Sequence, residues 1–175
     1  MLPSPKFDPD KNIIEFNGSL ISLHCHHYNC GLLKTIEEIS DIDGYAIIAE
    51  AAAEEFYSNF RRLLSTQLDA PSPDKALQAA SELYRFMGFG RLDLSHLTRD
   101  GGYAYADSSY YVTAWLAKYS RRDTPVCYFT CGFIAGILGA IFDIDPHTFM
   151  VKETQCMMLR QDYCEFVVSR KSDGG

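Results

Sequence analysis

The sequence lacks the motifs and segments that define several common classes of protein. Its 175 residues contain no glycine-rich phosphate loop, no Gly-x-Ser-x-Gly nucleophile motif and no His-Glu-x-x-His metal motif. No apolar run approaches the roughly 18 residues of a membrane span. Positive charge is also scarce, with 16 Lys and Arg against 23 Asp and Glu, so the net charge of −7 argues against binding to nucleic acid.

The amino terminus has neither a basic segment nor an apolar segment of the kind found in secretory signals, so we expect a cytoplasmic protein. In that compartment the six cysteines are expected to be free or metal-bound rather than paired in disulfides, and none of them forms a Cys-x-x-Cys motif. With 47% hydrophobic and 22% charged residues, the composition is typical of one folded domain over residues 1–175.

Hydrophobic spacing predicts an α+β domain in which helices cover one face of an antiparallel sheet. Asn17-Gly18 is suited to a hairpin turn, Asp43 and Asp74 to helix N-caps, and Ser108 or Ser109 to the start of a short helix. We expect helices over residues 32–39, 44–67, 75–89, 108–120 and 126–142, a hairpin around 100–102, and strands near 148–158 and 163–170.

The expected helix over 126–142 carries glycine and alanine along one side. Small residues at this spacing allow close packing, and we expect a buried helix packed on the sheet. A dimer interface formed by the same side is the alternative.

Three potential metal ligands lie in one expected strand–turn–strand, with the spacing Glu153-x2-Cys156-x7-Cys164. A hairpin would bring the two cysteines together, but residues 153 and 156 point to opposite faces of an ideal strand. A bulge is therefore needed for both to reach one ion. A further thiolate, from Cys127 or Cys131, would complete a four-coordinate zinc or iron site.

A closed shell of three thiolates and Glu153 would be a structural zinc site that joins the start of the helix to the terminal hairpin. Displacement of Glu153 would instead leave an open position on a reactive or redox metal. The third interpretation has no metal, with each cysteine a small buried apolar side chain.

A second cluster combines histidine and cysteine over residues 24–30. In a helix, His26 and His27 both neighbour Cys30, whereas an extended segment would place His24 and His26 on one face. Imidazole and thiolate together suit zinc, iron or copper, and a histidine could also act as a general acid or base. The alternatives are a second metal or pocket site and a purely structural segment.

Aromatic residues are plentiful enough to line an apolar cavity between the helices and the sheet, although most aromatic side chains belong to cores. The candidates for contact with a ligand are Tyr110, Tyr111, Trp115, Phe129 and Phe133.

Over residues 108–170 the chain resembles the 4-vinyl reductase family, also called hydrocarbon-binding proteins. The resemblance is carried by Pro125-Val126-Cys127, the segment GFIAGILGAI, and the segments KETQC and DYCEF. The Glu-x2-Cys-x7-Cys spacing is similar to that of zinc-binding members among phenol-sensing transcriptional activators, and this resemblance implies Cys127 as the fourth ligand. The longer segment FDIDPHTF departs from the pattern and keeps Cys131 as a competitor, and the usual glycine near residues 159–162 is missing.

The resemblance implies a fold related to TRAPP-type vesicle-tethering subunits and a homodimer. It also implies a domain that binds or senses a small apolar, aromatic or tetrapyrrole-like ligand. The rival interpretations are an enzyme that holds a metal or redox cofactor at His24–Cys30, and a scaffold without a ligand.

Overall fold

The computed structural model describes residues 3–66 and 71–171. In chain order the elements are β1 (Lys6–Asp8), β2 (Ile13–Phe16), β3 (Ser19–Ile21), α1 (His26–Glu37), α2 (Gly44–Thr66), α3 (Pro73–Phe86), β4 (Gly90–Asp93), β5 (Leu97–Thr98), β6 (Gly101–Ser109), α4 (Tyr110–Lys118), α5 (Tyr128–Phe142), the 3-10 helix η1 (Pro146–Thr148), β7 (Phe149–Gln155), the 3-10 helix η2 (Met157–Leu159) and β8 (Cys164–Arg170). No helix of these described residues is both long and apolar enough to cross a bilayer.

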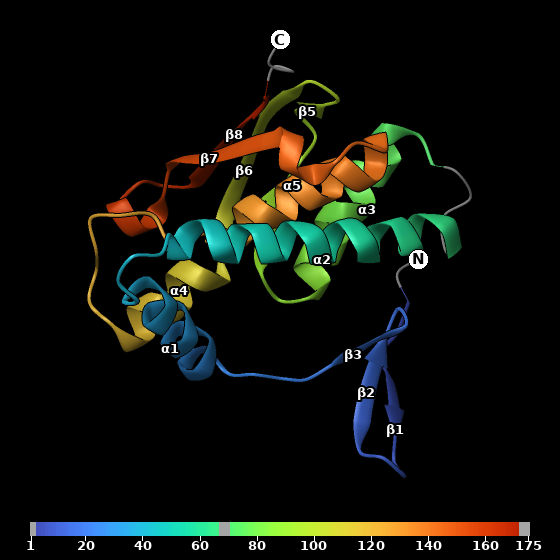
Figure 1. Ribbon diagram of the computed structural model, residues 1–175, viewed down its shortest axis with the longest axis horizontal. Coiled ribbons are helices and arrows are strands. Elements are labelled where there is room, and N and C mark those ends of the chain that lie inside the picture. Colours follow the sequence, from blue (N-terminus) through green and yellow to red (C-terminus); the bar gives the residue numbers. More distant parts are fainter. Residues whose placement is uncertain (1–2, 67–70, 172–175) are drawn as a thin grey trace.

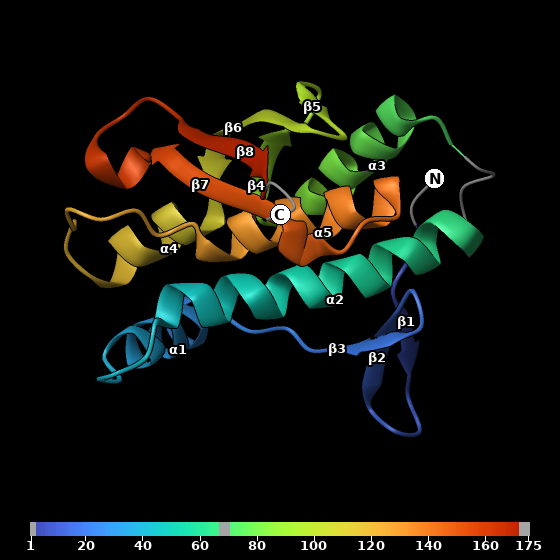
Figure 2. The same cartoon turned by 45° about the horizontal axis from the view of Figure 1, so that its top comes forward.

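The main sheet is antiparallel and has the strand order β4-β6-β8-β7, with β5 paired to β6. Figure 2 shows the layers one after another: this sheet, then α5 with α3 and α4, then α2. The prediction of a single α+β domain with helices on one face of an antiparallel sheet is confirmed.

The small side of α5 packs against α2. A Cβ atom added to Gly132 would lie 2.0 Å from the carbonyl oxygen of Ala49, and one added to Gly136 would lie 2.5 Å from that of Ala53. Glycine is therefore needed at both positions for the two helices to approach. The expected buried helix next to the sheet is present, and its small side is the side that faces the second helix layer.

The amino-terminal strands form a separate sheet of the order β1-β2-β3, which lies apart from the main sheet on the far side of α2 (Figure 1). The expected turn is present, since Asn17 and Gly18 have φ of 50° and 76°, as the mirror-image turns of tight hairpins require. Ser19 donates a hydrogen bond from its hydroxyl to Asn59 Oδ1 of α2 over 2.9 Å, and Arg62 Nη1 donates to the Asn17 carbonyl over 3.0 Å.

Several expected helix boundaries shift in the structure. Helix α1 begins at His26, six residues earlier than predicted, because its first turn contains histidines and an asparagine that carry no apolar periodicity. Helix α3 begins at Pro73 after Ser72, so Asp74 lies in the first turn and is not the N-cap. Ser109 is confirmed as the N-cap of α4, where its hydroxyl accepts a hydrogen bond from the Val112 amide.

Candidate metal centre

The hairpin of β7 and β8 contains the irregularity that the spacing of its ligands requires. Glu153 pairs with Phe166 and Gln155 pairs with Glu165, so Thr154 is an extra residue in β7. This bulge shifts the alternation of side chains, and both Glu153 and Cys156 point into the protein while Thr154 is exposed.

Four potential ligands meet beneath this hairpin: Cys127, Glu153, Cys156 and Cys164. Their ligand atoms all lie within 4.8 Å of one another. Cys164 Sγ lies 3.9 Å from both Cys127 Sγ and Cys156 Sγ. A tetrahedron with zinc–sulfur bonds of about 2.3 Å has edges of about 3.8 Å, so the thiols already stand at the separation that zinc needs.

The cluster is closed to solvent. The three cysteines have a relative exposure of 0% and Glu153 of 6%. Arg121 donates hydrogen bonds to the carbonyl oxygens of Met157 and Met158, which follow Cys156 in the chain. A metal ion here would have no direct contact with water.

One carboxylate oxygen of Glu153 is unsatisfied. Its Oε2 atom accepts a hydrogen bond of 3.1 Å from the Cys127 amide, whereas the buried Oε1 atom has no hydrogen-bond partner among the described residues. Burial, followed by the charge of Cys156, raises the pKa of Glu153 to about 8. A buried acceptor of this kind is costly unless it meets a donor or a cation, and a metal ion would satisfy it.

The three thiols stabilise one of their number, Cys156, as a thiolate. Hydrogen bonds from Cys127 and Cys164 lower the pKa of Cys156, and the pKa of Cys127 is raised in return. Because metal ligands must be deprotonated, a cluster that already favours a thiolate is suited to a cation. Three thiolates and a carboxylate fit zinc or iron, so the residues present fit the expected metal.

Cys131, the competitor for the fourth position, lies outside the cluster. Its sulfur accepts a hydrogen bond of 3.1 Å from the hydroxyl of Tyr45, one turn along α5 from Cys127. The segment between α5 and β7 contains η1, and Cys127 still lies beside the ligands of the hairpin.

Of the aromatic side chains predicted to line a cavity, the structure brings Tyr110, Phe129 and Phe133 into one cluster and leaves Trp115 apart. Phe133 packs on Tyr84 of α3 and on Phe56 of α2, with ring centroids 4.9 and 4.7 Å apart. The cluster continues through Phe129, Phe89 and Tyr111, and Tyr110 lies at its edge.

Trp115 instead contacts the loop before α5. Its indole nitrogen donates to the carbonyl oxygen of Ser120, and its ring lies under Arg122. Phe56, Tyr84 and Phe89 also belong to the aromatic cluster, although the sequence did not indicate them. The placement of Tyr84 on the buried, apolar face of an amphipathic helix is the one feature that could have indicated it.

The polar centre of this aromatic cluster is a buried pair of hydroxyl groups. The Tyr84 hydroxyl and Thr130 Oγ1 lie 2.7 Å apart, and burial raises the pKa of Tyr84 far above its ordinary value. Both groups are neutral hydrogen-bonding partners, and Cys127, Cys164 and Cys131 are near enough to the Tyr84 hydroxyl to contribute to the rise of its pKa.

Residues 26–30 of the histidine and cysteine segment begin α1, Cys25 is the N-cap, and His24 precedes the helix. His24 and His27 are exposed, His26 is half-buried and stacks near His27 with ring centroids 4.1 Å apart, and Cys30 is buried. Among the residues that the structure describes, no three donors of this segment lie within 4.8 Å of one another. A second metal or pocket site here stays a prediction.

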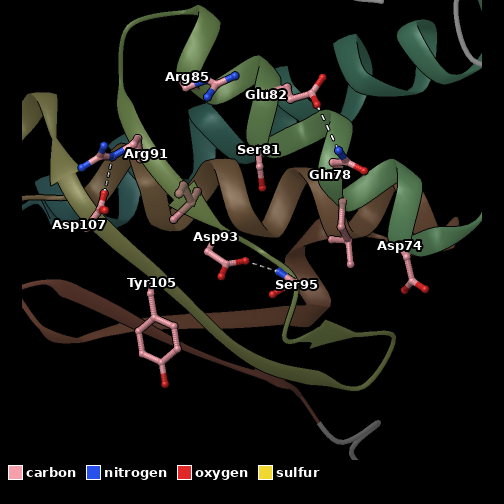
Figure 3. A pocket seen from close by; sticks show the side chains of 12 residues that line it. Asp74, Gln78, Ser81, Glu82, Arg85, Arg91, Asp93, Ser95, Tyr105 and Asp107 are labelled. Carbon is pink, nitrogen blue, oxygen red and sulfur yellow. Dashed lines mark hydrogen bonds and ion pairs between the residues drawn. The ribbon is translucent and has the colours of Figure 1, made fainter.

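A polar groove of about 670 Å³ runs between α3 and the strands β4 and β6 (Figure 3). Arg91 pairs with Asp107 over 2.8 Å, and Asp93 accepts a hydrogen bond from the Ser95 amide. None of the aromatic residues expected to contact a ligand lines this groove.

The chain matches the family model of the 4-vinyl reductase domain over residues 110–170. Its fold is similar to that of the phenol-responsive sensory domain of the transcription activator PoxR with phenol, with a TM-score of 0.76 and 13% identity over 95% of this chain and 84% of that one. It is also similar to a vinyl-4-reductase family protein from Methanocaldococcus jannaschii, with a TM-score of 0.58 and 17% identity over 87% and 84%. Among proteins with curated descriptions, none matches the chain in sequence.

At these identities the two solved structures show a shared fold and no more. The match over residues 110–170 confirms the resemblance that the sequence predicted, and it includes all four residues of the buried cluster.

Proposed function

We propose that the protein binds or senses a small aromatic molecule and carries a structural metal ion beneath the β7–β8 hairpin, because residues 110–170 match the 4-vinyl reductase domain. The observation that carries the metal assignment is the buried Glu153 Oε1 atom without a partner, beside three thiols at metal-ligand separations. Zinc is the metal that this donor set favours, with iron as the alternative.

In this proposal the metal ion has a structural role and takes no part in a reaction. Cys127 belongs to the start of α5, whereas the other ligands belong to the terminal hairpin, so one ion would join two distant parts of the chain. Four protein ligands leave no open coordination position, which is the pattern of structural zinc. Binding would therefore contribute several kcal/mol of folding free energy.

The metal assignment is tested by elemental analysis of protein purified without chelator. We expect one zinc or iron ion per chain in the wild type and a loss of that ion, with a lower melting temperature, in Cys156→Ser. Cys131→Ser is the matched control, since Cys131 is equally buried but lies outside the cluster, and it should keep the metal. Metal-free wild-type protein, or Cys156→Ser with normal metal content and stability, would contradict the assignment.

The ligand assignment is supported by the aromatic cluster between α2, α3, α4 and α5. Its side chains are mostly apolar, and their polar groups are the buried hydroxyl pair of Tyr84 and Thr130 and the hydroxyls of Tyr110 and Tyr111. A molecule with one aromatic ring and one hydroxyl group matches these surroundings, and the PoxR domain of similar fold is described with phenol. A one-ring ligand fits better than a tetrapyrrole, because the packed rings enclose the hydroxyl pair closely.

Entry of a ligand requires a ring to move. Phe89 and Phe129 are only half-buried and lie 4.5 Å apart at the edge of the cluster, so they are the rings best placed to yield. Helix α1 lies over this edge, where the side chain of Asn29 donates a hydrogen bond to the hydroxyl of Tyr110.

The amino-terminal part of the chain supports a homodimer. Large apolar side chains there are exposed: Phe7, Leu20, Leu23, Tyr28 and Leu32, with Leu23 the most exposed at 85%. Exposed apolar surface of this kind marks association sites, and a second copy of the chain is the partner we propose.

A further inference from the structure

A second group of potential metal ligands lies on the surface, where α2 meets η1. Glu50 and Glu54 project from successive turns of α2, and His147 lies in η1. Their ligand atoms all lie within 4.8 Å of one another, and His147 Nε2 lies 3.7 Å from Glu54 Oε1. None of the three belongs to the buried cluster or to the aromatic cluster.

The backbone holds these side chains together. Residues four apart on a helix share one face, so Glu50 and Glu54 point the same way. The turn that carries His147 is fixed by Asp145, whose side chain accepts a hydrogen bond from the His147 amide, and by the burial of Pro146. The imidazole is therefore presented to the two carboxylates by a well-ordered turn.

Among the described residues, the contact between His147 and Glu54 is the one ion-pair contact of this group. In the described part of the chain, no lysine or arginine nitrogen lies within 4.0 Å of either carboxylate. Arg61, two turns along α2 from Glu54, is occupied by the hydroxyl of Tyr57 and by Asp143. Two adjacent carboxylates repel each other, and a bound cation would replace that repulsion with attraction.

We propose that Glu50, Glu54 and His147 bind a divalent transition-metal ion at the surface. Two carboxylate oxygens and one imidazole nitrogen suit Zn²⁺, Co²⁺ or Ni²⁺, and water completes the coordination because the site is exposed. The ion ties α2 to the turn that leads into β7, the strand that carries Glu153. The ion would thus connect α2 with the start of β7, whereas the buried cluster lies near the end of that strand.

The proposal is tested with Zn²⁺ in competition with a chromophoric chelator, which counts the equivalents bound and ranks their affinities. We expect the wild type to bind a second, weaker equivalent beyond that of the buried cluster. His147→Ala should weaken this second equivalent by at least about tenfold and leave the first unchanged. Because His147 is exposed, the variant should fold normally, which circular dichroism would check.

Two controls separate this site from the other histidines. His96→Ala, which alters an exposed histidine outside the group, should keep the second equivalent, and so should the triple variant His24→Ala, His26→Ala, His27→Ala. The proposal is overturned if no equivalent of the wild type is lost or weakened in His147→Ala, or if the triple variant loses the same equivalent. Failure of the buried cluster would remove the tighter equivalent and leave the one that depends on His147, so the two failures are distinguishable.

Discussion

At the scale of single residues, the buried polar groups carry most of the functional information. The Tyr84 and Thr130 hydroxyls are hydrogen-bonded to each other inside an aromatic cluster, and Glu153 faces three thiols. Each of these groups loses its hydration on folding and is retained only where a partner, or a ligand, offsets that loss. Trp115, by contrast, serves the packing of the loop under Arg122.

The hydroxyl pair leads to a prediction about ligand binding. Tyr84→Phe removes one hydroxyl with little change of volume, so phenol should bind about tenfold more weakly, as expected for the loss of one hydrogen bond of about 1.4 kcal/mol. Isothermal titration calorimetry with phenol measures the change.

The matched control for this measurement is Tyr45→Phe. It removes a hydroxyl that donates to Cys131 outside the aromatic cluster, and phenol affinity should not change. Equal affinities of Tyr84→Phe and the wild type, or no heat with phenol at all, would contradict the assignment of the ligand to this cluster.

At the scale of secondary-structure elements, two local devices set the architecture. The Thr154 bulge turns Glu153 and Cys156 to the same side of β7, and the glycines of α5 let its backbone approach that of α2. The second device positions Cys127, since it holds the whole of α5 between the sheet and α2. Both features depend on one or two residues, and replacing these residues should lower the stability of the whole domain.

The close approach of α2 and α5 can be tested by a substitution that adds a single methyl group. In Gly132→Ala the new Cβ atom would meet the carbonyl oxygen of Ala49 at 2.0 Å and the Cβ atom of Ala52 at 2.7 Å. Because both belong to the rigid helix α2, we expect a loss of about 3 kcal/mol of stability, measured by urea denaturation.

Gly31→Ala is the control for this experiment, in the interior of α1. Its new Cβ atom would meet only the flexible end of Lys118, at 3.1 Å, and alanine favours the helix by about 1 kcal/mol. A Gly132→Ala variant as stable as the wild type would contradict the prediction, because it would show that α2 and α5 can move apart without loss of stability.

At the scale of the whole molecule, the four potential ligands connect regions that are far apart in the sequence. The loop between α4 and α5 adds to this connection, because Arg122 makes two hydrogen bonds of 2.8 Å to the carboxylate of Glu37 in α1. The body is thus tied together around the buried cluster. The three-stranded amino-terminal sheet lies on the far side of α2 from the main sheet (Figure 1). Its side chains Phe7 and Leu20 are exposed.

The exposed amino-terminal side chains predict an oligomeric state. Analytical ultracentrifugation should show a dimer for the wild type, and Leu20→Asp with Leu23→Asp should shift it toward the monomer, since charge at the centre of an apolar interface opposes association. Met150→Asp, at an exposed position of β7 with 55% exposure, is the control and should remain dimeric. A monomeric wild type would contradict the proposal.

The sequence by itself determined the fold class, most of the elements and the resemblance to the 4-vinyl reductase family, because hydrophobic periodicity, turn residues and the Glu-x2-Cys-x7-Cys spacing are local properties. It also indicated that a bulge was needed between Glu153 and Cys156. Only the tertiary structure placed Cys127, and not Cys131, beside the other three potential ligands, turned the small side of α5 toward α2, and separated Trp115 from the aromatic cluster. These outcomes depend on the angle and approach of packed elements, which pairs of residues distant in the sequence determine together.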